Sequence, residues 1–379
     1  MAFQIQQDLF IFTLCQRFET LLRVALVGAD GDRHFAVPSA GALYPYVFDL
    51  TFEIPRGSLR YKDVPLSGLS AVLKDAPLRG ATGLQISMAF QPERARAKYG
   101  NRGLTYGMQD CGHVLANLKL ASGPLGLATN VTVHPMAWAV GDILPNAIPV
   151  FDIDIRAAEE SRGDLSASIN KLDFLSAMMR RGSASAFDTA PCAPNTVAKI
   201  LARSQQIANH DPQRLEKFGF LLALRDAEHL WTVQGSDGLD GLGKRPARGV
   251  PLDPSALFFA QEFTTNAAAL VFFSAPKSGP EAVLDQCLCA GYAGQCLYIA
   301  AEMDGIGACC VGGFDYNQAE QIFGLPSDQY AAYAMLIGRK GIARPKVDRR
   351  RNLTLREAIV EFPATRSDVM HTSPLLETN

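Results

Sequence analysis

The stretch CGHVLANLKLASGPLGLAT, Cys111–Thr129, resembles the stretch AGYAGQCLYIAAEMDGIGA, Ala290–Ala308, later in the same chain. Aligning Gly112 with Gly291 keeps one constant offset through both stretches. The residues that then coincide are Leu118 with Leu297, Ala121 with Ala300, and Gly126 with Gly305. Such self-similarity within one chain indicates a duplicated structural unit.

Each stretch has the pattern of a helix. Apolar residues recur every three or four positions, at Val114, Leu118, Ala121 and Leu125 in the first stretch and at Ala293, Leu297, Ala300 and Met303 in the second. The small pairs Ala121–Ser122 and Ala300–Ala301 allow another backbone or a flat ligand to come close. We expect the helices to end at Gly126 and Gly305, because glycine readily takes the left-handed conformation that closes a helix.

Strands flank both predicted helices in the same order. Apolar and β-branched runs predict strands at 46–54, 84–90, 128–134 and 148–155 in the first half, and at 219–226, 268–275, 308–314 and 330–340 in the second. Each half therefore follows the order strand, strand, long helix, strand, strand. This order predicts an α+β fold in duplicate.

A polar segment at 157–170, rich in residues that break helices and strands, indicates the boundary between the halves. We expect a first domain at 1–160 and a second at 165–343. The remaining residues, 344–379, are expected to strap over the other domain and to end loosely after Ala364. A chain of 379 residues is too long for one ordinary domain and comfortable for two.

The composition argues against several functional classes. Hydrophobic residues make up 48% and charged residues 20%, so each half can bury a core, and the net charge of −2 gives no reason to expect a nucleic-acid partner. The N-terminus lacks the basic leading region of a signal peptide, and no apolar run reaches the roughly 20 residues of a membrane helix. We therefore expect a soluble, cytoplasmic protein that binds neither nucleic acid nor membrane.

The eight cysteines form no CxxC pair and show no metal-ligand spacing with histidine. We expect reduced thiols that pack as small hydrophobic residues, and no metal site. A zinc or disulfide role is the alternative.

The sharpest local motif is PSAGALYP, at 38–45. Gly41 would let the backbone approach a flat ring, and Ser39 offers a hydroxyl to ring heteroatoms. The motif resembles the PSAG segment of SagB-type (azoline) dehydrogenases of the nitroreductase superfamily, where it lies against the flavin ring. The resemblance implies that Pro38, Ser39, Ala40 and Gly41 contact flavin mononucleotide (FMN). The alternative is an ordinary turn before a strand, because Pro, Ser and Gly are common turn residues.

The motif KYGNRG, at 98–103, precedes the first predicted helix. It resembles the catalytic Lys-Tyr pair of the azoline-oxidising members, and this implies catalytic roles for Lys98 and Tyr99. Adjacent side chains on a strand would point apart, whereas in a loop both could face one substrate. Either group can act as an acid or base if burial shifts its pKa. The alternative is a solvated lysine beside a half-buried tyrosine.

The second half opens with MMRRGSASAF, at 178–187. It resembles the RRSxRxF phosphate-binding start of nitroreductases, with Arg181 and Ser183 matching the first Arg and the Ser. Arginine forks and hydroxyls suit a phosphate. Gly182 and Ser185 depart from the family pattern because they replace its other basic positions. The alternative is a charged helix end followed by a loop.

Two further stretches of the second half resemble flavin-binding parts of the same family. The glycine-rich GIGACCVGGF, at 305–314, implies that Gly305 and Gly307 pass near the edge of the flavin ring. In LIGRK, at 336–340, the resemblance implies that Arg339 and Lys340 hold the phosphate. Glycines after a helix are also ordinary caps, which is the alternative for the first stretch.

The motifs are divided between the halves. In nitroreductase homodimers the flavin sits at the interface, and both subunits contribute to each site. Here the first half carries PSAG and KYG, and the second carries the phosphate motifs. The resemblance therefore implies two tandem nitroreductase-like domains that form an intramolecular pseudodimer with one FMN per chain.

The resemblance also implies an activity. It predicts an FMN-dependent dehydrogenase that oxidises thiazoline or oxazoline rings in a peptide to thiazole or oxazole during peptide natural-product biosynthesis. The expected partners are a peptide substrate bearing azolines and a cyclodehydratase complex that makes them, and a homo-oligomer is left open. The alternatives are an NAD(P)H-dependent nitro- or quinone-reductase-like flavoenzyme and a non-catalytic flavin-binding or scaffold protein.

Overall fold

A computed structural model of the chain describes most of both halves. The described residues are 13–28, 35–75, 80–135, 146–158, 169–190, 192–209, 219–224, 229–233, 243–246 and 254–342. Residues Met1–Gly341 form one compact unit. The predicted strap at 344–379 and most of the polar boundary segment lie outside the described residues, so the predicted domain limits stay predictions.

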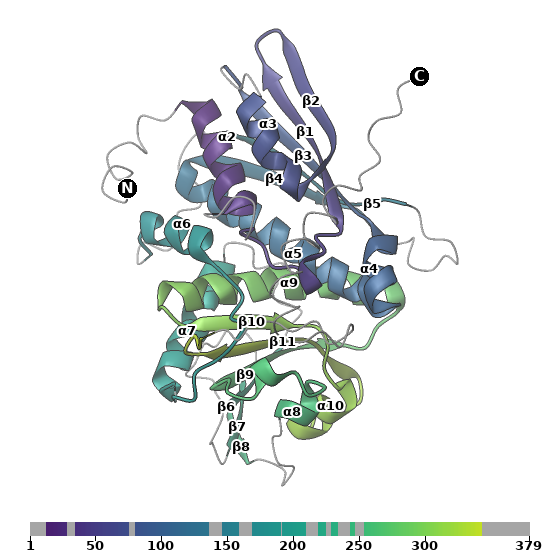
Figure 1. Ribbon diagram of the computed structural model, residues 1–379, viewed down its shortest axis with the longest axis vertical. Helices are drawn as coiled ribbons and strands as arrows, with labels where there is room; N and C mark the ends of the chain where they lie inside the picture. The colour runs from purple at the N-terminus through teal and green to yellow at the C-terminus, as the bar shows by residue number, and fades with distance from the viewer. Residues whose placement is uncertain are drawn as a thin grey trace, which may run out of the picture. The chain divides into compact units, whose positions relative to one another are not determined.

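The first half contains a five-stranded antiparallel sheet (Figure 1). Its strands are β1 (Tyr46–Ile54), β2 (Gly57–Pro65), β3 (Gly83–Phe90), β4 (Leu127–Val133) and β5 (Ile148–Ala157). They pair in the order β2-β1-β3-β5-β4. Side chains along β3 and β4 alternate between more and less buried, as expected for a sheet with one face on the core.

The second half contains a six-stranded antiparallel sheet. Its strands are β6 (Gly219–Leu224), β7 (His229–Val233), β8 (Gly243–Pro246), β9 (Ala269–Pro276), β10 (Gly307–Val311) and β11 (Gln329–Gly338). They pair in the order β10-β11-β9-β6-β7-β8. Strands β9 and β11 are buried along almost their whole length, because apolar clusters cover both faces of this sheet.

The two sheets have the same topology. Read from the opposite end and without the additional edge strand β8, the second order matches the first, with β2, β1, β3, β5 and β4 corresponding to β7, β6, β9, β11 and β10. The α+β class and all eight predicted strands are confirmed, with ends that differ by a few residues. The sequence reasoning missed β2 and its counterpart β7, and also β8.

A long helix follows the third matched strand in each half: α5 (Arg102–Ser122) after β3, and α9 (Pro280–Met303) after β9. Helix α5 begins nine residues, and α9 ten residues, before the repeated stretch that predicted it. Their ends agree with the prediction, since Gly126 (φ 66°) and Gly305 (φ 68°) take the left-handed conformation just after the helices. A short 3₁₀ turn separates α5 from Gly126.

The other helices cover the sheets and link the strands (Figure 1). They are α2 (Leu14–Leu22), α3 (Leu69–Asp75), α4 (Pro92–Tyr99), α6 (Lys171–Arg180), α7 (Pro194–Ala208), α8 (Pro254–Leu257) and α10 (Tyr316–Phe323). A five-residue π-helical turn, η1 (Arg23–Val27), continues α2. No helix in the described part of the chain is long and apolar enough to cross a membrane.

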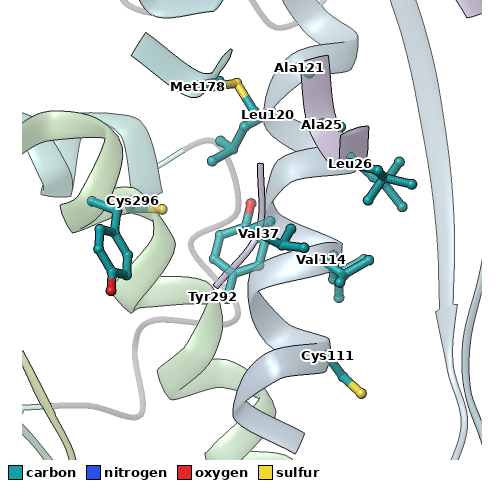
Figure 2. Packing of buried hydrophobic residues seen from close by; sticks show 14 of the residues in the cluster. Ala25, Leu26, Val37, Cys111, Val114, Leu120, Ala121, Met178, Tyr292 and Cys296 are labelled. Carbon is teal, nitrogen blue, oxygen red and sulfur yellow. The ribbon is translucent and has the colours of Figure 1, made fainter. Parts of the chain in front are cut away.

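The two halves meet where α5 crosses α9. A Cβ added to Gly112 would collide with the backbone carbonyl of Leu288, and one added to Gly291 would collide with the carbonyl of Gln109. The glycines that align the repeat are therefore the residues that let the two helix backbones touch. Figure 2 shows the apolar cluster around this crossing, with side chains from α5, α9, α6 and η1.

The cysteines carry no disulfide. Cys111, Cys287, Cys289 and Cys296 are buried, as expected for thiols that pack as small hydrophobic residues, and the other four are half-buried. Within the described ranges, no three His, Cys, Asp or Glu side chains are grouped so that they could hold a metal ion.

Candidate functional site

The PSAG segment forms a tight loop between η1 and β1. Its conformation is left-handed at Gly41 (φ 61°), Ala42 (φ 54°) and Tyr44 (φ 44°). Asp110 of α5 anchors it: Ser39 Oγ donates to Asp110 Oδ2 at 2.6 Å, and the Ala40 N–H donates to the same carboxylate at 3.2 Å. The loop is therefore fixed to the helix whose repeat reveals the duplication.

Ser39 acts as an anchor of this loop. Besides donating to Asp110, its Oγ accepts the Tyr44 N–H at 2.9 Å. The hydroxyl proton is thus engaged within the protein, rather than directed at a ring heteroatom as the sequence reasoning expected. Contact between Pro38–Gly41 and a flavin stays a prediction.

Lys98 and Tyr99 lie at the last turn of α4, next to the PSAG loop. Lys98 Nζ donates to the Gly41 carbonyl at 3.2 Å. Lys98 Nζ and Tyr99 Oη both lie so close to Gly41 that a Cβ on this residue would collide with them. The two polar groups therefore converge on the Cβ side of Gly41. The pair is at a helix end rather than in a strand or loop, yet both side chains face Gly41. Burial raises the pKa of Tyr99, with the charge of Asp110 adding to the effect.

Arg181 joins the second half to the residues just before PSAG. Its side chain is buried, with Nε donating to the Ala36 carbonyl at 2.8 Å and Nη2 to the Phe35 carbonyl at 2.9 Å. The guanidinium also lies over the Tyr298 ring at 5.0 Å. Its Nη1 is buried and has no hydrogen-bond partner among the described residues. Arg181 is thus a buried cation whose Nη1 can still donate hydrogen bonds.

The other predicted phosphate residues gather on the same edge of the second sheet. Residues 183–188 run beside β10 and the end of β11, with Ser183 bridged to Ala308 and Phe187 to Lys340. Ser183 Oγ hydrogen-bonds Tyr298 Oη at 2.8 Å. Gly307 lies against Lys340, whereas the Cβ position of Gly305 faces open space.

The two basic residues after β11 differ in their partners. Lys340 Nζ is paired with Glu302 at 2.7 Å, so much of its charge is already neutralised. Arg339 is exposed, and its carbonyl accepts the Asp188 N–H at 3.0 Å. Of the four predicted phosphate ligands, Arg181 therefore keeps the clearest capacity for an anion.

A buried polar network, which the sequence reasoning missed, crosses between the halves. Asn117 Nδ2 donates to the carbonyls of Ala25 at 2.8 Å and Ala36 at 3.1 Å. Its Oδ1 is then an acceptor, and Gln295 Nε2 of α9 donates to it at 2.7 Å. Ala36 accepts from both Asn117 and Arg181, so this network and the arginine hold the same backbone.

These bonds determine the tautomer of His113. Gln295 Oε1 must accept from His113 Nδ1 at 2.9 Å, and this leaves Nε2 to accept from Tyr333 Oη at 3.1 Å. Burial lowers the pKa of His113 to about 3, with the charge of Arg181 contributing. A neutral imidazole therefore links α5, α9 and β11.

Asp110 was also missed, although it stands one residue before the quoted repeat. It is 4% exposed, and burial raises its pKa to about 7 against the lowering effect of its bonds to Ser39 and Ala40. Tyr44 lies within reach of both buried ionisable groups: burial raises its pKa, the charge of Arg181 lowers it, and Asp110 raises it. This places the PSAG anchor and the arginine in one region.

Further aromatic rings and an arginine lie near Tyr99. The Tyr99 ring contacts the Tyr106 ring edge-on at 5.2 Å, and Tyr106 lies against Gly312. Arg102 lies over the ring of Phe259 at 5.6 Å, and Phe259 is 52% exposed with a left-handed backbone (φ 53°). Tyr99, Arg102 and Gly312 lie within quoted motifs, but the contacts of Tyr106 with Gly312 and of Arg102 with Phe259 were not predicted, because they join residues from both halves.

The fit of these residues to FMN can be judged from Arg181. A buried guanidinium without a carboxylate partner is costly unless an anion or further acceptors satisfy it, and the described residues provide two carbonyls only. A phosphate would supply that anion. The residues present therefore fit a phosphate-bearing group, with Arg181 as its main cation.

Known proteins resemble this chain in part of its sequence and in its fold. Residues 178–339 match the profile of the Nitroreductase family. A solved structure of a candidate nitroreductase from Anabaena variabilis ATCC 29413 is similar with a TM-score of 0.65 and 18% identity, over 86% of this chain and 88% of that chain. This likeness shows a nitroreductase-like fold. None of the curated proteins matches the chain.

Further solved structures match about half of the chain. A candidate nitroreductase from Ralstonia eutropha JMP134 is 17% identical over 47% of this chain and 87% of that chain, with a TM-score of 0.36. An oxidoreductase containing FMN is 20% identical over 48% of this chain and 80% of that chain, with a TM-score of 0.31. Both TM-scores are too low to carry an argument.

Proposed function

We propose that this chain, whose residues 178–339 are a nitroreductase-family segment within a nitroreductase-like α+β fold, is an FMN-dependent dehydrogenase. Its proposed substrate is a peptide bearing thiazoline or oxazoline rings, which it oxidises to thiazole or oxazole. The proposed partner is a cyclodehydratase that makes those rings.

The observation that carries the proposal is the convergence of Lys98 Nζ and Tyr99 Oη on Gly41. Oxidation of an azoline removes a hydride from one ring carbon and a proton from its neighbour, so a proton acceptor must lie where the ring binds. Two acid–base groups beside the proposed flavin-facing loop meet this need.

The two groups suit different tasks. Burial raises the pKa of Tyr99, so its phenol keeps its proton near neutral pH and can donate a hydrogen bond to a ring heteroatom. Lys98 Nζ, in its neutral form, would take the proton from the ring carbon. When bound, FMN supplies the acceptor for the hydride.

The proposed holding of FMN is shared between the halves. Pro38, Ser39, Ala40 and Gly41 would lie on its ring side, and the basic and glycine residues of the second half on its phosphate side. The latter are Arg181, Ser183, Gly305, Gly307, Arg339 and Lys340. Arg181 supports this assignment most directly, because its buried Nη1 has no described partner.

The test uses the full chain reconstituted with FMN and given a synthetic thiazoline peptide. We expect each oxidised ring to lose two hydrogens, read by mass spectrometry. Lys98→Ala and Tyr99→Phe should keep FMN and slow oxidation by about 100-fold, a usual contribution of general acid–base catalysis.

Matched controls lie together on β2, away from the PSAG loop. Lys62→Ala changes an exposed lysine, and Tyr61→Phe removes a hydroxyl while keeping the ring that packs on Phe52. Full azoline oxidation by both Lys98→Ala and Tyr99→Phe would refute the assignment. Turnover of NADPH with a nitroarene, without azoline oxidation, would favour a nitro- or quinone-reductase-like enzyme. A protein that cannot be reconstituted with FMN would contradict both enzyme functions.

A further inference from the structure

The PSAG loop needs stabilising contacts from outside the loop to keep its backbone conformation. Ala42 (φ 54°) and Tyr44 (φ 44°) take left-handed conformations that cost free energy for residues with a side chain. Such conformations persist where neighbouring groups over-determine them. Within the loop itself, the bonds are those from the Ala42 N–H to the Ser39 carbonyl at 3.0 Å and from the Tyr44 N–H to Ser39 Oγ at 2.9 Å.

Asp110 of α5 supplies these contacts. Its carboxylate accepts from Ser39 Oγ at 2.6 Å and from the Ala40 N–H at 3.2 Å. It is 4% exposed, and no salt bridge to it is present among the described residues. A buried carboxylate is retained at a cost, so its bonds to the loop are its evident compensation.

The internal repeat offers a natural comparison. Under the alignment of Gly112 with Gly291, the position of Asp110 is taken in the second half by Cys289. That half has no PSAG motif. The carboxylate thus occurs only in the half that has the loop.

The loop in turn holds Lys98. The Gly41 carbonyl, which accepts from Lys98 Nζ at 3.2 Å, comes one residue after the Ala40 amide that Asp110 fixes. A shift of the loop would therefore move the acceptor that orients the lysine. Side-chain positioning at this scale matters because misplacement of about 1 Å can slow a reaction about 100-fold.

We propose that Asp110 is a positioning residue: through Ser39 and Ala40 it fixes the PSAG loop, and thereby holds the Gly41 carbonyl against Lys98. The effect on catalysis rests on the proposed function, whereas the effect of Asp110 on the conformation of the loop does not.

The first test measures the loop without any activity. Hydrogen exchange of the peptide covering residues 38–44 is followed in wild type, Asp110→Asn, Ser39→Ala and the double variant. Above pH 7, where the Asp110 carboxyl is ionised, we expect exchange about tenfold faster or more in each single variant, which is the size of losing a hydrogen bond to a charged group. The double variant should be faster than either by less than the product of the two single effects, because the Ser39–Asp110 bond is lost in both single variants.

The control variant is Asp49→Asn. Asp49 also accepts a backbone N–H, from Asp63 at 2.8 Å, but it is exposed and lies on β1 away from the loop. Its substitution should leave exchange at residues 38–44 unchanged. Ser39→Ala alone does not decide the test, because it also removes the bond from the Tyr44 N–H to Ser39 Oγ. If Asp110→Asn does not fold, as judged by its melting curve, Asp110→Glu takes its place. Wild-type exchange at residues 38–44 in the folded Asp110 variant would overturn the proposal.

The second test asks whether the hold serves catalysis. With azoline peptide, we expect Ser39→Ala and Asp110→Asn to lower kcat about tenfold or more, with KM for the peptide changed less than threefold. Asp110→Asn, which replaces no residue proposed to contact FMN, should also change FMN affinity less than threefold. Faster exchange with an unchanged kcat would overturn the catalytic part of the proposal. If wild type oxidises no azoline, the proposed function fails, and the exchange experiment still decides the hold on the loop.

Discussion

Two ionisable side chains, Asp110 and Arg181, are buried where the halves of the chain meet. They are satisfied in opposite ways: Asp110 accepts from the PSAG loop, and Arg181 donates to the backbone just before it. Neither forms a salt bridge among the described residues. Their burial therefore depends on hydrogen bonds to one short segment, residues 35–40, and this makes both sensitive to substitution.

Asp110 should make folding stability depend on pH. Its pKa is about 7 in the folded protein and near the ordinary 3.8 when unfolded. Between these values the folded state holds a proton that the unfolded state has released. The contribution of Asp110 to stability is therefore complete below about pH 4 and is lost as pH rises through 7.

Replacing Asp110 by Asn removes this dependence. We expect the free energy of unfolding of wild type, relative to Asp110→Asn, to fall by on the order of 3 kcal/mol between pH 4 and 8, measured by urea denaturation. The ionisable groups that interact with this carboxyl are Tyr44, Tyr46, Tyr99, Cys111 and Tyr333. The tyrosine and cysteine pKa values are all raised, so these groups stay neutral in this range. Parallel pH curves for wild type and variant would contradict the prediction.

Arg181 and its neighbour Arg180 provide a matched pair. Arg181→Ala should lower the free energy of unfolding by about 3 kcal/mol, because it leaves the Phe35 and Ala36 carbonyls without this donor and weakens the join between the halves. Arg180→Ala should change it by less than about 0.5 kcal/mol, since the side chain is 56% exposed. Urea denaturation measures both. Equal effects would show that the buried bonds of Arg181 do not stabilise the fold.

At the scale of elements, the prediction reached beyond the two repeated stretches to the strands that flank them. Strands were predictable where apolar runs fill a buried position, as in β1 and β9. Strand β2 was not, because most of its side chains are exposed and GSLRYKDVP has no apolar run. The starts of α5 and α9 were missed because periodicity was read only within the similar stretches.

The helix crossing yields a sharp test. Alanine normally stabilises a helix over glycine by about 1 kcal/mol. Gly112→Ala and Gly291→Ala should instead destabilise the protein by about 3 kcal/mol or more, because each new Cβ meets backbone of the facing helix, which cannot yield as a side chain could. Thermal melting would show the loss. Gly182→Ala is the control, since its Cβ position is open. Unchanged melting of both crossing variants would mean that the helices do not touch there.

At the scale of the whole molecule, the chain joins motifs that stand far apart in sequence. PSAG, KYG and the arginine segment were predicted to contribute to one site. The structure brings Gly41 to Lys98, and it brings Arg181 to Ala36, which lies just before PSAG. The residues that hold them, Asp110, Asn117, His113 and Gln295, could not be predicted. Their roles depend on tertiary contacts between helices, which no local pattern encodes.

The division of the motifs predicts a flavin stoichiometry. We expect one FMN per chain, because the basic segment that contains Arg181 has no counterpart in the first half and PSAG has none in the second. Absorbance of flavin released from a known amount of reconstituted protein measures the ratio. Arg181→Ala should lower FMN affinity, whereas Arg180→Ala should not. A ratio of two would contradict the single composite site.

The bond from Arg181 to Ala36 joins two halves of one polypeptide, and this has a consequence for dilution. A site shared by separate subunits comes apart when the protein is dilute, since association depends on concentration. Here the partners are tethered, and their effective concentration is set by the chain itself, commonly in the millimolar range for flexible links. With FMN kept in excess, specific activity should therefore stay constant down to the lowest protein concentration that an assay can read.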